Sequence, residues 1–357
     1  MPDTTTEKAD ENQTHIQSAA HSSPSITSVN AAAAPDIIIP VHVPDDLPLA
    51  SAAALSRGHR HNNPLYAFLH PHGVHSKFRR LEGRIGRIGF GAKGVIYGMV
   101  GGMTCASANR LNGASWNESP QGAFILLGGF DASGTMLVIM LLCLSCYIIW
   151  RIWEAWTMQG ADAALSDGKN FFSYRFSPAV SAGVYMAYAF YILRILIVKN
   201  VKGESSGCYP NCWRSSVAGR AGLVLFGIAF TIACLTQLQN AFTKKWHYEI
   251  KWERCRFKAE EWMILFTGHI GFLGRACSFM FIAALMFKAL GKDEVKQGGN
   301  IFANGLNQLL DADLGGVIAM MAIGLMLTFY GFYCVTLMHY RHFPTPPPSG
   351  VPRYTPR

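Results

Sequence analysis

Four basic side chains lie inside or at the ends of long apolar stretches, where an unpaired charge is costly. They are Lys93, Arg194, Arg275 and Lys288. A cation near the centre of a bilayer costs about 2.5–3.5 kcal/mol on insertion scales. As functional groups, these residues would bind an anion, a lipid headgroup or a carboxylate partner. The alternative, which we favour, is that each long side chain reaches the membrane surface or bonds a neighbouring helix.

Two cysteines are the other residues that could take part in chemistry. Cys208 and Cys212 enclose the short segment Tyr-Pro-Asn, on the side that the charge distribution places outside the cytoplasm. A disulfide suits such an oxidising compartment. A redox or metal site would need further ligands, which the sequence does not place nearby. We therefore keep a disulfide and two free thiols as equal alternatives.

The sequence shows no recognisable catalytic or cofactor-binding motif. Walker loops, dinucleotide fingerprints, zincin helices and nucleophile elbows are all missing from it. Its glycine-rich runs lie inside apolar stretches rather than between a strand and a helix, so they do not form a phosphate loop. We expect a protein that is not an enzyme and that has no cofactor and no metal.

Six apolar windows must position these residues. They cover residues 88–108, 135–155, 178–198, 220–242, 271–290 and 315–338. About 20 helical residues are needed to cross a hydrocarbon core of about 30 Å. Apolar residues make up 50% of the 357 and charged residues 15%, well below the roughly 25% charged residues of a soluble domain. The sequence therefore predicts an all-α integral membrane protein with six transmembrane helices.

The first window carries Gly94, Gly98 and Gly102 at intervals of four residues. This spacing places the three glycines on one face of a helix, where another helix backbone can approach closely. We predict a helix-packing face, which could also serve self-association of the protein. A pore or groove lined by bare backbone is the alternative.

The windows also contain a weak internal repeat with the order basic, small, cation and aromatic. The paired positions are Arg87 with Arg175, Tyr97 with Tyr185, Gly89 with Gly271, Lys93 with Arg275, and Tyr147 with Tyr330. Self-similarity of this kind indicates that one supersecondary unit recurs along the chain. The repeat predicts that the six helices form three repeated helical hairpins.

This pattern resembles a family of multi-pass membrane proteins known as domain of unknown function 1206. The family's second helix often ends in Tyr-x-x-Trp-Arg-x-x-x-Ala, which here corresponds to Tyr147, Trp150, Arg151 and Ala155. The resemblance covers about residues 84–343, and Lys93 stands where the family usually has arginine. It implies a membrane fold of three two-helix repeats and no established activity.

Composition divides the chain into five parts. They are a disordered N-terminal tail (1–76), a first repeat hairpin (77–162), a second hairpin with a basic segment (163–262), a third hairpin (263–343) and a Pro-rich tail (344–357). The N-terminal tail is predicted to be disordered because it is rich in Ser, Thr, Ala and Pro and has few large apolar residues. The basic segment 243–262 is expected to extend the fourth helix or to lie along the interface.

The net charge of +9 is concentrated beside the apolar windows. Lysine and arginine are more numerous on the side of the two termini, which predicts that both termini face the cytoplasm. This placement favours the lipid bilayer over nucleic acid as a partner. The basic run 77–87 is expected to attract anionic lipid at the cytoplasmic face, at about 1 kcal/mol per residue.

These observations favour a non-enzymatic membrane protein with an assembly or membrane-organising role. Packing glycines and basic flanks without a catalytic constellation motivate this hypothesis. A transporter or channel for a small molecule or an ion is the alternative.

Overall fold

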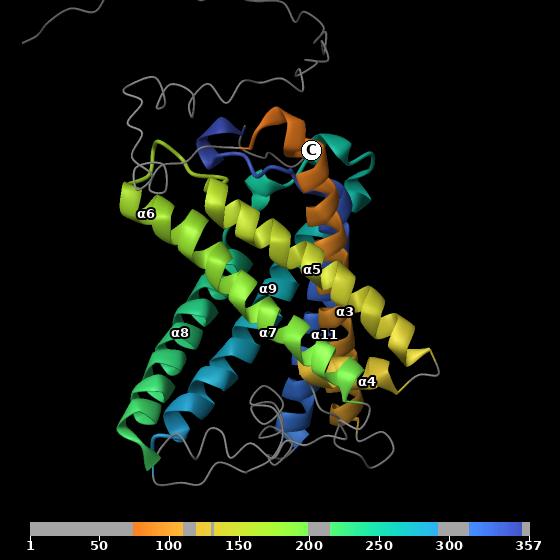
Figure 1. Cartoon of the computed structure of the whole chain (residues 1–357), viewed down its shortest axis with the longest axis vertical. Coiled ribbons are helices and arrows are strands. Elements are labelled where there is room, and N and C mark those ends of the chain that lie inside the picture. Colours follow the sequence, from red (N-terminus) through yellow and green to blue (C-terminus); the bar gives the residue numbers. More distant parts are fainter. Residues whose placement is uncertain (1–73, 110–118, 130–131, 199–214, 292–313, 352–357) are drawn as a thin grey trace, which may run out of the picture. The chain divides into compact units, whose positions relative to one another are not determined.

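The computed structural model describes residues 74–109, 119–129, 132–198, 215–291 and 314–351. Within these ranges the chain is helical and forms no β-strand, so the predicted all-helical class is confirmed there. The long helices are α3 (Arg79–Ala108), α5 (Ser133–Thr157), α7 (Ser177–Ile197), α8 (Val217–Phe242), α9 (Lys258–Lys288) and α11 (Leu314–Tyr340) (Figure 1). The predicted N-terminal tail lies almost entirely outside the described residues.

Among the residues that the structure describes, five helices are long and apolar enough to cross a membrane, which indicates a membrane protein. They are Ser133–Thr157, Asp167–Ile197, Val217–Phe242, Lys258–Lys288 and Leu314–Tyr340. Each overlaps one predicted window, and two of them begin at least ten residues earlier than the window. The remaining window, 88–108, falls within α3, a helix of 30 residues whose glycines and basic residues lower its mean hydropathy.

Short elements connect the long helices. Between α3 and α5 lies α4 (Pro120–Gly128), whose first turn is capped by a 3.0 Å hydrogen bond from the amide of Gly122 to the Ser119 hydroxyl. Ahead of α7, the helix α6 (Asp167–Phe171) and the π-helical turn η3 (Phe172–Phe176) continue into it without a break. The 3₁₀ turns are η1 (Ser76–Phe78), η5 (His247–Glu249), η6 (Trp252–Arg254) and η7 (Pro348–Gly350).

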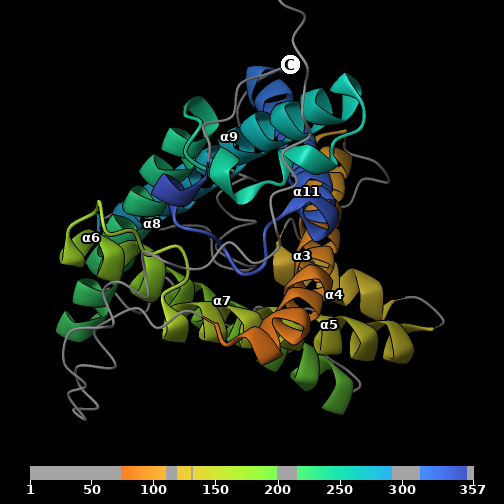
Figure 2. The same ribbon diagram turned by 90° about the horizontal axis from the view of Figure 1, so that it is seen from above.

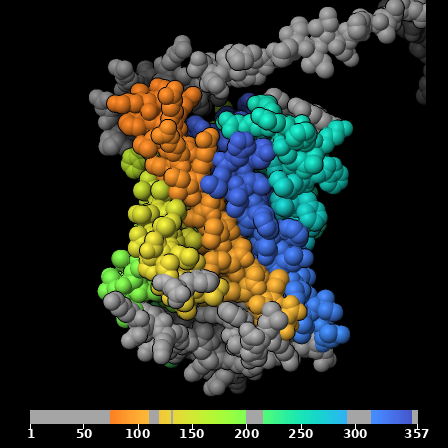
Figure 3. Space-filling view, turned by 90° about the vertical axis from the view of Figure 1, so that its right-hand side faces the viewer, coloured from red at the N-terminus to blue at the C-terminus, as the bar shows by residue number. Residues whose placement is uncertain are grey.

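The long helices pack side by side in the order α7, α5, α3, α11, α9 and α8. Figure 3 shows α3 in orange between α5 in yellow and α11 in blue, and Figure 2 gives the same neighbours from above. The first and third predicted hairpins therefore pack as pairs, α3 with α5 and α9 with α11. The two helices of the middle hairpin do not pack along each other, because α7 lies against α5 and α8 lies against α9.

The closest helix pair, α3 and α11, is brought together by glycines on both helices. A Cβ atom on Gly101 would lie 2.6 Å from the carbonyl oxygen of Gly324, and one on Gly331 would lie 2.7 Å from the amide nitrogen of Gly98. Gly94 also faces this contact, since its Cβ would lie 2.9 Å from the carbonyl oxygen of Gly331. Of the three predicted packing glycines, only Gly94 thus has α11 where its Cβ would lie, and at Gly98 and Gly102 nothing lies within 4 Å of that place.

The basic segment does not extend the fourth helix as one of its two predicted placements required, and the start of the Pro-rich tail is packed against the bundle. Because α8 ends at Phe242 and α9 begins at Lys258, the end of the basic segment 243–262 extends the fifth predicted span rather than the fourth. The first residues of the Pro-rich tail are packed against the bundle: Ser349 donates hydrogen bonds to Asp162 from its amide at 2.8 Å and from its hydroxyl at 2.7 Å.

Candidate functional site

Lys93 lies one helical turn after Gly89 on α3. Because Gly89 has no side chain, α5 comes very close there, and a Cβ at this position would lie 2.5 Å from the Cα atom of Tyr147. The Lys93 side chain is buried, with 5% exposed, and its Nζ donates a 3.4 Å hydrogen bond to the Tyr147 hydroxyl. The sequence left two structural roles for Lys93, namely reaching the membrane surface or bonding a neighbouring helix. The structure shows a bond to the neighbouring helix α5.

Arg275 occupies the equivalent position on α9, one turn after Gly271. A Cβ on Gly271 would lie 2.6 Å from the Cα atom of Tyr330 on α11. The Nη1 atom of Arg275 donates hydrogen bonds to the Tyr330 hydroxyl at 2.8 Å and to Oε1 of Gln237 at 3.1 Å. Glycine, cation and tyrosine thus have the same relation in α9 and α11 as in α3 and α5.

The ring of Tyr330 links the two cations. Its centroid lies 5.3 Å from Nζ of Lys93 and 4.6 Å from Cζ of Arg275, within the range of cation–π attraction. Tyr97 adds a second ring, with its centroid 4.8 Å from that of Tyr330 and 5.3 Å from Cζ of Arg275. The positive charges of Lys93 and Arg275 therefore both lie against the ring of Tyr330.

Every long helix contributes to this site, which we name the central cationic cluster. Its members are Lys93 and Tyr97 (α3), Tyr147 (α5), Tyr185 (α7), Gln237 (α8), Arg275 (α9) and Tyr330 (α11). The ring of Tyr185 joins the cluster from α7, with its centroid 4.5 Å from that of Tyr147. The cluster is the place where helices from both ends of the packing order meet.

Lys93 and Arg275 have no carboxylate partner among the residues that the structure describes. Their hydrogen bonds there go to uncharged oxygens, and Nε of Arg275 is buried without a hydrogen-bond partner. Glu154, an acid near the end of α5, pairs instead with Arg151 and Arg341. Buried charge without a counter-charge is costly, and aromatic rings compensate only part of that cost. The cluster therefore offers positive charge that a bound anion would neutralise.

A second polar network lies where α3 begins and where α5 and α11 end. Arg341 contacts Glu154 at 3.5 Å and Glu249 at 3.1 Å. The Thr345 hydroxyl donates to Oε1 of Glu154 at 3.4 Å, and the Thr345 amide donates to Oε1 of Gln159 at 3.3 Å. These bonds hold the chain after α11 against the end of α5.

Glu82 is fully buried beside this network, in the first turn of α3. Burial raises the pKa of its carboxyl from 4.5 to about 7, although the neighbouring Gln159 and Arg79 favour the charged form. A carboxyl with this pKa exchanges its proton near neutral pH, so the end of the bundle carries a proton-sensitive group.

The remaining predicted site residues lie away from the cluster. Arg194 and Lys288 are in the last turns of α7 and α9 with exposed side chains, as the alternative of reaching the membrane surface requires. Cys208 and Cys212 fall outside the described residues. Gly102 has nothing within 4 Å of the place where its Cβ would be.

The sequence did not indicate that tyrosines and an amide would surround the two cations. The sequence identified Tyr97, Tyr147, Tyr185 and Tyr330 only as positions of the internal repeat. A usable signal was present, because Gln237 is a polar residue inside an apolar window and such residues seek partners within the bundle.

The sequence of the first hairpin also matches a known protein family. Residues 88–158 match the family model described as Domain of Unknown Function (DUF1206). The predicted resemblance is thereby confirmed over this stretch, which comprises most of α3 together with α4 and α5. The DUF1206 stretch supplies Lys93, Tyr97 and Tyr147 to the central cationic cluster. Comparisons with curated proteins and with solved structures gave no match.

Proposed function

We propose that this chain is a carrier or channel for a small anion, which binds at the central cationic cluster within the membrane. One observation carries the proposal: Lys93 and Arg275 both lie against the ring of Tyr330, and neither has a carboxylate partner among the described residues. An anion would supply the missing counter-charge. The buried Nε of Arg275 provides a donor for it.

The position of the cluster supports transport as well as binding. Carriers built from helical repeats hold their ligands within the bilayer, at the interface between repeats. Here Lys93 and Arg275 come from the first and third copies, and all six long helices contribute a side chain. A small shift of one helix pair against another would change the contacts of the bound anion.

We further propose six spans in three two-helix repeats, with both termini in the cytoplasm. The matching glycine, cation and tyrosine geometry of the first and third copies supports the repeat. Helix α3 has 30 residues and is about 45 Å long at 1.5 Å per residue, which is enough to cross a membrane between α5 and α11. Labelling of Cys208 and Cys212 by a thiol reagent outside intact cells, after reduction, tests the orientation.

Flux measurements in proteoliposomes test the proposed function. Vesicles with purified full-length chain are loaded with chloride, phosphate or acetate, and efflux is followed under an imposed potential. We expect efflux of at least one anion, and its loss in Lys93→Met and in Arg275→Met. Arg194→Gln, which removes an exposed cation at a helix end, should leave the flux unchanged. Efflux of none of the three anions, or equal flux in all variants, would overturn the proposal.

An assembly or membrane-organising role is the second candidate function, and the exposed apolar surface of α8 favours it. Of the 26 residues of α8, the buried ones are Leu223, Gly227 and Ala241, so most of this apolar helix is free for lipid or for a partner. We propose no catalytic role in either case. The mass of the purified protein in detergent decides between a monomer and an assembly, and flux by a monomer supports the carrier.

A further inference from the structure

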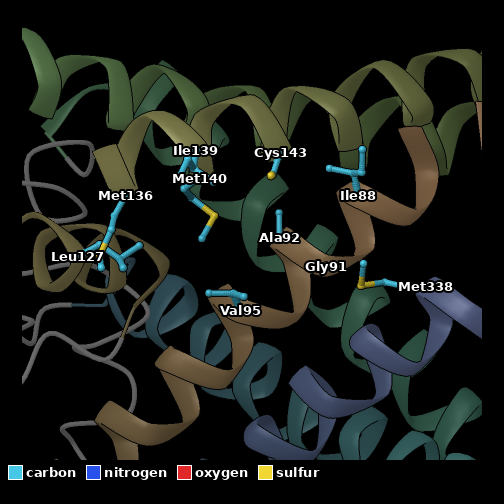
Figure 4. Close-up of a pocket in the computed structure, with 10 residues that line it drawn as sticks. All are labelled: Ile88, Gly91, Ala92, Val95, Leu127, Met136, Ile139, Met140, Cys143 and Met338. Atoms are coloured by element: carbon cyan, nitrogen blue, oxygen red, sulfur yellow. The ribbon is translucent and has the colours of Figure 1, made fainter. Parts of the chain in front are cut away.

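We propose a second ligand site, separate from the central cationic cluster: a groove on the outside of the bundle that holds an anionic phospholipid. The groove lies between α3 and α5 and encloses about 340 Å³. Figure 4 shows Ile88 and Val95 of α3 on one side and Met136, Ile139 and Cys143 of α5 on the other.

The groove has the character of an acyl-chain site. Every side chain that lines it is apolar or carries sulfur, and it is open toward the outside of the bundle. Val95 is 45% exposed and Ile139 is 55% exposed, so large apolar surface remains available to a ligand. At Gly91 the α3 backbone itself forms part of the wall. A flexible hydrocarbon chain fits such a surface because it needs no hydrogen-bond partner.

Arginines continue the same face of α3 beyond the groove. Arg80, Arg84, Ile88, Gly91 and Val95 follow one another at intervals of three or four residues, and so they lie along one stripe of the helix. Both arginines are exposed. A headgroup held by them would direct its acyl chain along the stripe into the groove.

The length of the stripe matches one leaflet of a bilayer. Val95 lies eleven positions after Arg84, which corresponds to a rise of about 16 Å at 1.5 Å per residue. Half of a hydrocarbon core of about 30 Å is about 15 Å. When Arg84 lies at the level of the lipid phosphates, the groove therefore spans the apolar half of the same leaflet.

Charge favours an anionic lipid over a second copy of the chain in this groove. Two copies in one membrane are related by an axis along the membrane normal, so a two-fold contact on this face would bring Arg80 and Arg84 of both copies to the same depth. Like charges at that distance repel. A phosphodiester headgroup with net negative charge neutralises the pair instead.

Lipid binding to the purified full-length chain in detergent, followed by native mass spectrometry, tests the site. We expect phosphatidylglycerol to bind more tightly than phosphatidylcholine with the same acyl chains. Each arginine near a membrane surface contributes about fivefold in affinity, so Arg80→Gln with Arg84→Gln should weaken phosphatidylglycerol binding by about 25-fold. The matched control, Arg256→Gln with Lys258→Gln, removes two exposed cations at the start of α9 and should change it little.

A phosphatidylglycerol with a photoreactive acyl chain locates the lipid. Crosslinks should concentrate on Val95, Ile139 and Cys143, and Val95→Trp, which fills the groove, should reduce them severalfold. Equal binding of the two lipids, equal affinity in the two double variants, or crosslinks spread over α8 would overturn the proposal. None of these readouts involves Lys93 or Arg275, so the site stands or falls separately from the proposed anion carrier.

Discussion

Arg275 of α9 donates a 2.8 Å hydrogen bond to the hydroxyl of Tyr330 on α11, and its guanidinium also lies 4.6 Å from the centroid of that ring. One residue thus anchors a buried charge in two ways. A charge held between two helices in this manner couples their packing to the state of the site. This contact is the one that we would perturb first.

Tyr330→Phe should destabilise the protein by about 1.5–3 kcal/mol, because it removes the acceptor of a charged, buried donor. Thermal unfolding in detergent micelles measures the effect. Tyr188→Phe is the control, since the hydroxyl of Tyr188 makes no hydrogen bond with the described residues and its ring is kept. Equal melting temperatures for the two variants would contradict the role of the Arg275 contact.

Lys93→Met should raise the melting temperature when no anion is added. Replacing a buried charge by an apolar side chain of similar volume is often stabilising by about 1–4 kcal/mol. The same variant should lose any rise in melting temperature that chloride, phosphate or acetate gives to the wild type. A lower melting temperature, with the anion effect retained, would show that Lys93 is structural.

Gly101 and Gly102 form a matched pair at the contact of α3 with α11. A Cβ on Gly101 would overlap Oγ1 of Thr328 and would lie 2.6 Å from the carbonyl oxygen of Gly324, whereas one on Gly102 meets nothing within 4 Å. We expect Gly101→Ala to cost about 1–3 kcal/mol by overpacking. Gly102→Ala should be neutral or gain up to about 1 kcal/mol of helix propensity. Denaturant unfolding of both variants checks the difference.

Glu82 should make stability fall as pH rises from about 4.5 to about 7. Burial raises its pKa in the folded protein to about 7, so over this range the folded state keeps a proton that the unfolded state has lost. Glu82→Gln should remove this decline. Unfolding of variant and wild type across the pH range measures it.

Two histidines work in the opposite direction and serve as an internal reference. Burial lowers the pKa of His247 and of His342 to about 4, so protonation of the unfolded state weakens the fold as pH falls from about 6.5 to about 4. In Glu82→Gln these groups remain, and stability should then rise with pH. A decline that persists in the variant would remove Glu82 as its source.

Asp162 should be the anchor of the segment after α11. Burial alone would raise its pKa, but hydrogen bonds from Ala164 and Ser349 outweigh burial and lower it, so the carboxylate stays charged at neutral pH. Asp162→Ala should speed amide hydrogen exchange in residues 344–351. Asp167→Ala, which removes an exposed acid nearby, should leave this exchange unchanged. Fast exchange in the wild type would contradict the anchoring.

Apolar length predicted five of the spanning helices well, because each must bury about 20 residues in lipid whatever its neighbours are. Helix ends were predicted less well. The sequence placed the start of the fifth span at Gly271, but α9 begins at Lys258. The extra turns contain the apolar run 262–266, which lies outside the predicted window and is separated from it by the segment 267–270, with Thr267, Gly268 and His269.

By itself, the sequence determined that this is an all-helical membrane protein, that it resembles DUF1206 (which the family model matches over residues 88–158), and that four cations lie inside or at the ends of its apolar stretches. These conclusions rest on composition and spacing, which are local. Only the tertiary structure decided that Lys93 and Arg275 share the ring of Tyr330, that α11 packs against Gly94 and Gly101, and that α7 and α8 lie apart. Such contacts join residues that are far apart in the chain, and the spacing of apolar residues along a helix does not record which neighbour each face will meet.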